Sequence, residues 1–150
     1  MLIQIMWALL CTLVTLLTHG AYAYRLILML RRHSKAVHQH HRHADVLSEY
    51  VFIEAVLMLL LLHTLEAGIW GLFYFLHPGG LPDFETAMYF SLTSYTTIGY
   101  GDVLLSPALR LVGAMEGVVG TLMFGLSVGL MAAVVHQSAV YQKITSAESD

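Results

Sequence analysis

The chain contains three long apolar runs, which limit its possible folds more than any other feature. They cover about residues 2–30, 50–76 and 107–136. A helix needs about 20 apolar residues to cross the hydrocarbon core of a bilayer, and each run is long enough. Helices satisfy all their backbone hydrogen bonds inside lipid. With 57% hydrophobic and 11% charged residues, the sequence predicts an all-α membrane protein with three transmembrane helices.

These runs use most of the 150 residues, so we expect no separate soluble domain. We divide the chain into an N-terminal helix with its linker, residues 1–49, a central part, 50–136, and a short polar tail, 137–150. The net charge of −3 gives no reason to expect a nucleic acid partner. The single cysteine, Cys11, excludes a disulfide within the chain.

The first run has two interpretations. Residues 21–23, with the sequence AYA, are typical of a signal-peptide cleavage site. However, no basic residue precedes the run, and apolar sequence resumes at residues 26–30. These features favour a transmembrane helix over a cleaved signal peptide.

The linker at residues 31–43 combines four basic side chains with five histidines. Because basic linkers stay in the cytoplasm, we expect a multi-pass protein of the cell (inner) membrane with its N-terminus outside and its C-terminus cytoplasmic. Histidine binds transition metals and titrates near neutral pH, so the linker is either a solvated polar segment or a metal-binding or pH-sensing cluster. The histidines concerned are His38, His40, His41 and His43.

The segment between the second and third runs is too short to cross the membrane. Proline and glycine at residues 77–82 end the second helix, and Asp83 is a suitable N-cap for a helix that ends near Tyr95. About thirteen residues give a helix roughly 20 Å long. Such a helix is tolerated at membrane depth when protein or water surrounds it. The sequence therefore predicts a re-entrant pore helix, and Ser106 followed by Pro107 then predicts the start of the third helix.

The loop after this short helix, residues 96–102, has the sequence TTIGYGD. Glycine takes positive φ as readily as negative, so Gly99 and Gly101 allow successive carbonyls to turn toward one axis, which other residues resist. The side chains of Ile98 and Tyr100 must then point away from that axis and pack behind the loop. Rings of such carbonyls from several copies can replace the hydration shell of a potassium ion.

Residues 97–101, TIGYG, resemble the signature loop of tetrameric potassium channels, with isoleucine where valine is commonest. Residues 50–136 resemble the bacterial two-span pore-domain family, which lacks the first helix found here. The resemblance implies a passive, potassium-selective homotetramer in the lipid membrane, formed with three further copies, with no covalent chemistry and no cofactor besides the permeant ion. It also implies the potassium ligands, which are Thr97, Ile98, Gly99, Tyr100 and Gly101.

The third run is rich in glycine, and its glycines have two interpretations. Glycines four residues apart permit close helix packing. By the resemblance, this is the pore-lining helix, with a hinge near Gly120, a cavity-facing Phe124, and His136 at its inner end as a further gate candidate. The glycines are Gly113, Gly117, Gly120, Gly125 and Gly129. Thr121, Phe124, Val128 and Ala132 recur at helical spacing, as a cavity-lining face or a packing stripe would.

Two carboxyl groups, Glu66 and Glu116, lie inside the second and third runs. A charge at the bilayer centre costs about 2.5–3.5 kcal/mol, so we expect both to face protein and at least one to be protonated. In some members of the resembled family, a pore-helix glutamate braces the filter aspartate. Counted back from Asp102, the matching position here is Thr93.

We predict that Glu116, with Glu66 as the second candidate, replaces this brace by reaching the pore helix near Thr93 or Tyr95. His63, one turn before Glu66, is either a third member of the site or packs against the first helix. A second group of acidic side chains is expected at the outer mouth, where it would concentrate cations. Its members are Asp83, Glu85 and Asp102.

Two other functions stay open at this point. One is a His-rich membrane protein that binds or transports a divalent metal, with His63, Glu66 and Glu116 as ligands. The other is a poorly selective cation channel, because the loop sequence alone does not set the degree of selectivity. The first alternative leaves the TIGYG loop without a purpose.

Overall fold

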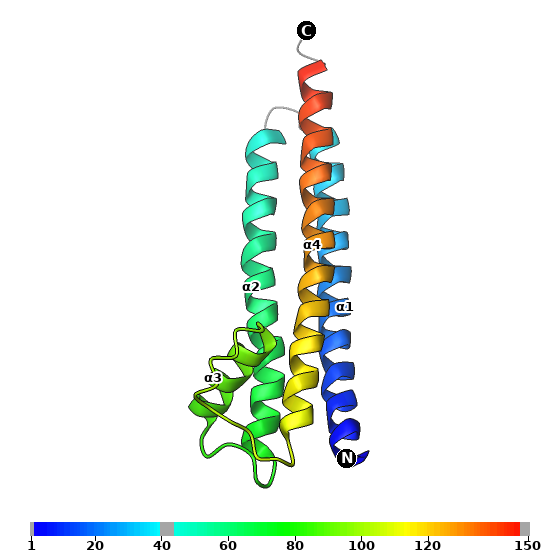
Figure 1. Ribbon diagram of the computed structural model, residues 1–150. Helices are drawn as coiled ribbons and strands as arrows, with labels where there is room; N and C mark the ends of the chain where they lie inside the picture. Colours follow the sequence, from blue (N-terminus) through cyan, green and yellow to red (C-terminus); the bar gives the residue numbers. More distant parts are fainter. Residues whose placement is uncertain (1, 40–43, 148–150) are drawn as a thin grey trace. The chain divides into compact units, whose positions relative to one another are not determined.

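The computed structural model describes residues 2–39 and 44–147, with side chains described for residues 2–32, 50–137 and 139. Every regular element in these ranges is a helix (Figure 1). The helices are α1 (Leu2–Gln39), α2 (Ala44–Leu76), α3 (Phe84–Tyr95) and α4 (Arg110–Ala147). The predicted all-α fold is confirmed.

Three of these helices contain stretches long and apolar enough to cross a membrane: Leu2–Arg32, Tyr50–Leu76 and Arg110–Gln137. The fourth, α3, has 12 residues and lies between the second and third spans, as the sequence predicts for a re-entrant helix. Helix α1 runs without a break through residues 21–23 and into the basic linker. Residues 40–43 and the side chain of His38 lie outside the described part of the chain, so the metal or pH role of the linker histidines stays untested.

The chain divides into two compact units. One consists of Met1–His19 and Leu62–Gly125, and the other of Gly20–Leu61 and Leu126–Asp150. Within the second unit, the Tyr22 hydroxyl donates to the carbonyl of Ala55 at 3.1 Å. The first unit contains α3, the loop that follows it and the parts of α1, α2 and α4 that pack around them, so the candidate site lies there.

The core of the first unit lies against α3. Its largest fully buried side chains include Trp70, Tyr74 and Tyr95. In lipid, association of helices depends on close packing and interhelical hydrogen bonds, since lipid tails are as apolar as the core. One such bond joins α1 to α2, where the Trp70 indole N–H donates to the Thr15 hydroxyl at 3.1 Å.

Three glycines of α4 allow its backbone to approach α3 and the adjoining loop. A Cβ on Gly120 would lie 2.0 Å from the Tyr95 carbonyl oxygen, and one on Gly117 would lie 3.3 Å from that of Ser94. Gly113 faces the Phe90 and Leu105 side chains in the same way. Close packing therefore explains these glycines. Among the described residues, no atom lies within 4 Å of a Cβ added at Gly125 or Gly129.

The predicted start of the third long helix is wrong. Helix α4 begins at Arg110, not at Pro107, and Ser106 is not its N-cap. The Ser106 hydroxyl instead donates to the carbonyl of Gly79 at 3.1 Å, in the loop after α2. The Ser106 carbonyl accepts the Leu109 N–H at 2.9 Å, which closes a single turn before the helix. A tertiary contact has taken the side chain that would have formed the cap.

Candidate functional site

Helix α3 begins at an N-cap and ends just before the loop that follows it. Its predicted N-cap is confirmed, because one Asp83 carboxylate oxygen accepts the Thr86 backbone N–H at 2.8 Å and the other accepts the Thr86 hydroxyl at 2.8 Å. The backbone and hydroxyl hydrogen bonds from Thr86 lower the pKa of Asp83 below its usual value. The helix ends at Tyr95, and its C-cap Thr96 is followed by the TIGYG loop.

The loop has the backbone conformation that its sequence predicts at both glycines. Gly99 has φ +53° and Gly101 has φ +78°, so both are left-handed. Thr97 also has a positive φ, 62°, which sequence analysis missed. A residue with a Cβ in this conformation costs about 1–2 kcal/mol. Two backbone hydrogen bonds join residues 97–101 to α3, from the Gly99 N–H to the Thr93 carbonyl and from the Thr97 N–H to that of Ser94, both at 3.0 Å.

Ile98 and Tyr100 do not pack behind the loop within this chain. Their side chains are 55% and 69% exposed. The prediction that they point away from an axis requires neighbouring copies, and a single chain leaves it untested.

Asp102 is held by a residue that sequence analysis did not select. The Tyr89 hydroxyl donates to its carboxylate at 2.8 Å, and this bond to an acidic group raises the pKa of Tyr89. The Thr93 hydroxyl bonds to the Phe90 carbonyl of its own helix at 2.9 Å. Thr93 therefore supports the loop through its backbone carbonyl.

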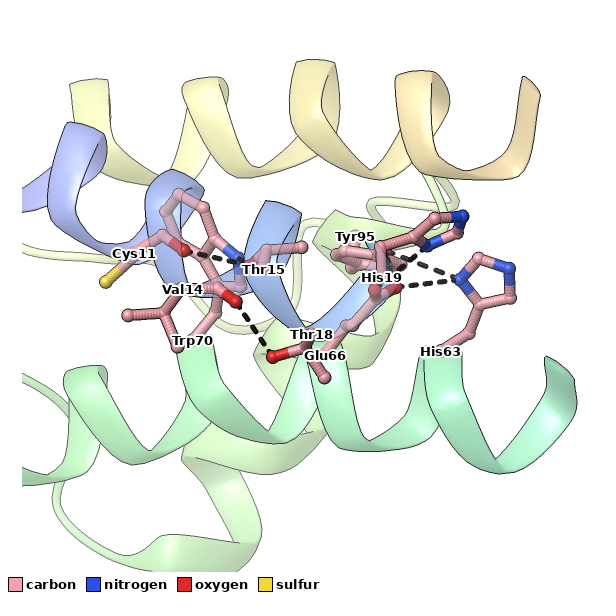
Figure 2. A network of polar contacts seen from close by, with 9 residues as sticks. All are labelled: Cys11, Val14, Thr15, Thr18, His19, His63, Glu66, Trp70 and Tyr95. Carbon is pink, nitrogen blue, oxygen red and sulfur yellow. Dashed lines mark hydrogen bonds and ion pairs between the residues drawn. The ribbon is translucent and has the colours of Figure 1, made fainter. Parts of the chain in front are cut away.

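Glu66 lies at the centre of a buried network that joins three helices (Figure 2). Its Oε1 lies 3.0 Å from His19 Nδ1 on α1. Its Oε2 accepts the Tyr95 hydroxyl at 2.6 Å and lies 3.1 Å from His63 Nδ1. We call these four residues, His19, His63, Glu66 and Tyr95, the Glu66 cluster. Tyr95 is the last residue of α3 and lies two positions before Thr97, so the cluster contacts the helix end from which the TIGYG loop starts.

Phe124, a candidate gate residue, packs against the Glu66 cluster. Its ring centroid lies 4.3 Å from that of His63 and 5.8 Å from that of Tyr95. The side chain is 37% exposed, so one part of it contacts the cluster while another part is open. A role in gating stays a prediction.

Glu116 forms a second buried site with hydroxyl partners. The Tyr74 hydroxyl donates to its Oε2 at 2.9 Å. Ser91 Oγ lies 2.5 Å from Glu116 Oε1 and 2.5 Å from the Ala67 carbonyl oxygen. One serine hydroxyl carries one proton, so it cannot donate to both. A protonated Glu116 that donates to Ser91, with Ser91 donating to Ala67, satisfies all three oxygens.

The two carboxyl groups thus contact the pore helix at different residues. Glu66, the second candidate, reaches Tyr95, whereas Glu116 reaches Ser91, one turn earlier on α3. Among the described residues, the hydrogen bonds of Glu116 go to Tyr74 and Ser91 and not to Thr93 or Tyr95, near which it was expected to reach α3. Both carboxyl groups face protein, as predicted from the cost of charge in lipid. Their support of the filter stays a prediction.

Sequence analysis missed His19. An Asp, Glu, Lys, Arg or His side chain inside a membrane span is a functional candidate by default, and His19 is the one such residue between positions 2 and 24. That rule would have suggested a buried partner on another helix. No comparable signal marks Tyr74, Ser91 or Tyr89, because isolated hydroxyl residues are common in such helices.

The ligands expected for a divalent metal separate into two places. His63 and Glu66 contact each other, but Glu116 belongs to the hydroxyl site. Among the residues whose side chains are described, 2–32, 50–137 and 139, no group of three or more His, Cys, Asp or Glu is arranged to hold a metal ion.

The remaining gate candidates lie on α4, which is continuous from Arg110 to Ala147. Gly120 is explained by its contact with Tyr95, and a hinge there stays a prediction. His136 is exposed. Near the start of α3, a depression of about 430 Å³ is lined by Asp83, Glu85 and residues that include Tyr89, the partner of Asp102.

Comparison with known proteins identifies the class. The sequence model of a family described as ion channels matches residues 50–137, more than half of the chain. The chain therefore belongs to this ion channel family. No curated protein and no solved structure matches it. The matched stretch contains α3, the TIGYG loop and both buried carboxyl groups, whereas α1 lies outside it.

Proposed function

We propose that the protein is a homotetrameric, potassium-selective channel of the cell (inner) membrane. In this proposal, residues 97–101 of four copies form the filter, and their carbonyls replace the water around a potassium ion. The observation that carries the proposal is the left-handed backbone at Gly99 and Gly101 directly after a short helix, in a chain of the ion channel family. The protein conducts passively and performs no covalent chemistry.

Two features of α3 support this function. Its C-terminus lies at the loop, so its partial negative charge favours a cation there. The backbone bonds from Gly99 and Thr97 to α3 fix the loop to that helix end. Four such ends around one axis would act together on one ion.

The exposed filter side chains support assembly with further copies. Ile98 and Tyr100 are apolar or aromatic, and both are more than half exposed in one chain. Packing against neighbouring subunits would cover them and fix the diameter of the filter. With the basic linker in the cytoplasm, the loop opens toward the outside and the C-terminus lies inside.

A flux measurement in liposomes tests the proposal. Purified protein should release potassium down its gradient and exclude sodium, and deletion of residues 33–43 should leave this flux intact. Equal sodium and potassium flux would instead support a poorly selective channel. Zinc uptake without potassium flux would support a metal transporter.

A pair of glycine variants separates filter geometry from general strain. Gly99 and Gly79 both have positive φ, +53° and +79°, and neither has an atom within 4 Å of an added Cβ among the described residues. Gly99→Ala should abolish potassium selectivity, because a Cβ strains the filter backbone by about 1–2 kcal/mol in each copy. Gly79→Ala carries the same strain outside the filter and should keep selectivity. Wild-type selectivity in Gly99→Ala would overturn the filter assignment.

A further inference from the structure

The proposed function leaves α1 without a role, since this helix lies outside the matched stretch of the ion channel family. Its first half nevertheless enters the unit that contains the filter loop. Two of its polar side chains are buried there: Thr15, fully, and His19, at 3% exposure. Each makes a hydrogen bond to α2, but the two bonds lead to different places.

The bond from His19 leads to the filter. His19 Nδ1 lies 3.0 Å from Glu66 Oε1, and the other oxygen of the same carboxyl group accepts the Tyr95 hydroxyl at 2.6 Å. Tyr95 is the last residue of α3. A chain of two hydrogen bonds through one carboxyl group therefore connects α1 to the residue just before the filter loop (Figure 2).

Among the described residues, Glu66 is the one hydrogen-bonding partner of His19. Its second ring nitrogen, Nε2, is buried and makes no hydrogen bond to any described residue. Its ring also lies 5.9 Å from that of His63, the other imidazole on Glu66. Leaving a buried nitrogen unpaired is unfavourable, and within the described part of the chain the contact with Glu66 is the hydrogen bond of His19 that offsets this cost.

The carboxyl group of Glu66 is planar, so fixing one oxygen fixes the other. His19 holds Oε1, while Tyr95 and His63 use Oε2. Without His19, Oε1 would be buried and unpaired. The carboxyl group would then turn toward other donors and weaken its bond to Tyr95.

The backbone of Tyr95 is restrained separately, by α4. Gly120 of α4 packs so closely on the Tyr95 carbonyl that no larger residue fits. The hydroxyl end of Tyr95 is therefore held by Glu66 and its backbone end by α4. A change at the hydroxyl end acts on a residue whose position sets the start of the filter.

We propose that His19 of α1 is a positioning residue for the filter, acting through Glu66 and Tyr95. The additional helix is then part of the filter support, while Thr15 only attaches α1 to α2. The consequence for ion conduction rests on the proposed potassium channel function, but the mechanical link from His19 to residues 96–101 does not.

The test compares His19→Leu, which removes the donor, with His19→Asn, whose amide N–H can occupy the place of Nδ1. Thr15→Val is the matched control, because it removes a buried bond between the same two helices one turn away, without touching Glu66. Hydrogen exchange of peptides that cover residues 93–101 is measured on the full-length protein in lipid nanodiscs. Single-channel potassium currents are recorded from the same samples.

We expect His19→Leu to speed exchange in residues 93–101 about tenfold, as for loss of one buried bond to a charged group. It should also shorten channel openings. His19→Asn should restore both, and Thr15→Val should change neither. If His19→Leu and Thr15→Val give the same exchange in residues 93–101, α1 only packs against α2 and the inference is wrong.

A second variant keeps the test decisive if His19→Leu does not fold. Tyr95→Phe removes the other hydrogen bond of this chain, from Tyr95 to Glu66, so it should raise hydrogen exchange in residues 93–101 by a similar factor. Unchanged exchange in Tyr95→Phe would overturn the proposal. If the wild type passes no potassium current, the proposed function fails, while the exchange comparison still decides the link from His19.

Discussion

The two carboxyl groups buried in the transmembrane helices are held in different ways. Glu66 and Glu116 are both fully buried and both contact α3. Glu66 is approached by two imidazoles and a phenol, and one of these partners comes from α1, outside the stretch matched by the ion channel family. Glu116 is approached by hydroxyl groups that all lie within that stretch.

The difference teaches what each site requires of its carboxyl group. Hydroxyl groups both donate and accept, so the Glu116 site serves a neutral carboxyl group, and the proton count at Ser91 favours one. The Glu66 site presents the Tyr95 hydroxyl and two Nδ1 atoms to one carboxyl group, which suits a carboxylate. The Glu116 site therefore requires a neutral group that can both donate and accept hydrogen bonds, whereas the Glu66 site requires a negative charge.

Glu66→Ala should have the largest effect. It removes the acceptor of two buried side chains, His19 on α1 and Tyr95 on α3, and one contact of the half-buried His63. At about 1–3 kcal/mol for each of the two buried groups, the midpoint of thermal unfolding should fall strongly and potassium flux should be lost. Glu54→Ala, at an exposed glutamate of the same helix, is the control and should change neither. Wild-type stability in Glu66→Ala would show that the cluster is not structural.

Glu116→Ala should have the next largest effect. It leaves the Tyr74 and Ser91 hydroxyls without this partner, at about 1–3 kcal/mol each. Ser91 keeps its bond to Ala67, so the true cost lies toward the lower end. We expect lower thermal stability and shorter openings, measured by unfolding and single-channel recording. If Glu116→Ala kept the stability and open times of the wild type, the contact with Ser91 would not support the filter.

Substitution of each glutamate by glutamine should distinguish the two sites most clearly. Glu116→Gln keeps a donor for Ser91 and an acceptor for Tyr74, so conduction should be preserved. Glu66→Gln removes the charge and replaces one acceptor oxygen with an N–H group, so a partner that donates to the carboxylate must turn away or change its tautomer, which should cost about 1–3 kcal/mol. The measurement is potassium flux together with thermal unfolding of the tetramer. Equal tolerance at both positions would remove the distinction between them.

The exposed carboxylate at the other end of α3 should give the smallest effect, which sharpens the contrast with the buried pair. Asp83 has its pKa lowered by hydrogen bonds from Thr86. Because the folded pKa lies below the unfolded value, its stabilisation is present above the usual value of 3.8 and is lost as pH falls through the folded pKa. Asp83→Asn should reduce this loss of stability in acid, measured by backbone hydrogen exchange at residues 84–87. An unchanged acid profile would show that the cap does not titrate there.

The features of the fold that could be predicted from the sequence are those that depend on neighbouring residues in the chain. Apolar length gave the three spans, and Pro and Gly followed by Asp83 gave the start of α3. The positive φ at Gly99 and Gly101 followed from the lack of a Cβ. Ser106 failed as a cap because it bonds to Gly79, a residue 27 positions earlier, which no local rule can foresee.

The partners of the buried carboxyl groups were less predictable than their burial. The cost of charge in lipid was sufficient to place Glu66 and Glu116 against protein. Their partners depend on helix packing, since Glu66 meets His19 across 47 positions in the sequence and Glu116 meets Ser91 across 25. The same rule applied to His19 would have identified the remaining member of the Glu66 cluster.

The central claim is that four copies of the TIGYG loop form one potassium filter. It is tested most directly by determining the structure of the purified protein in potassium-containing lipid nanodiscs. The account predicts a fourfold assembly with ion density on its axis, between the carbonyls of residues 97–101, and with Ile98 and Tyr100 packed away from the axis. Loops that do not face a common axis, or an axis without ions at their level, would contradict it.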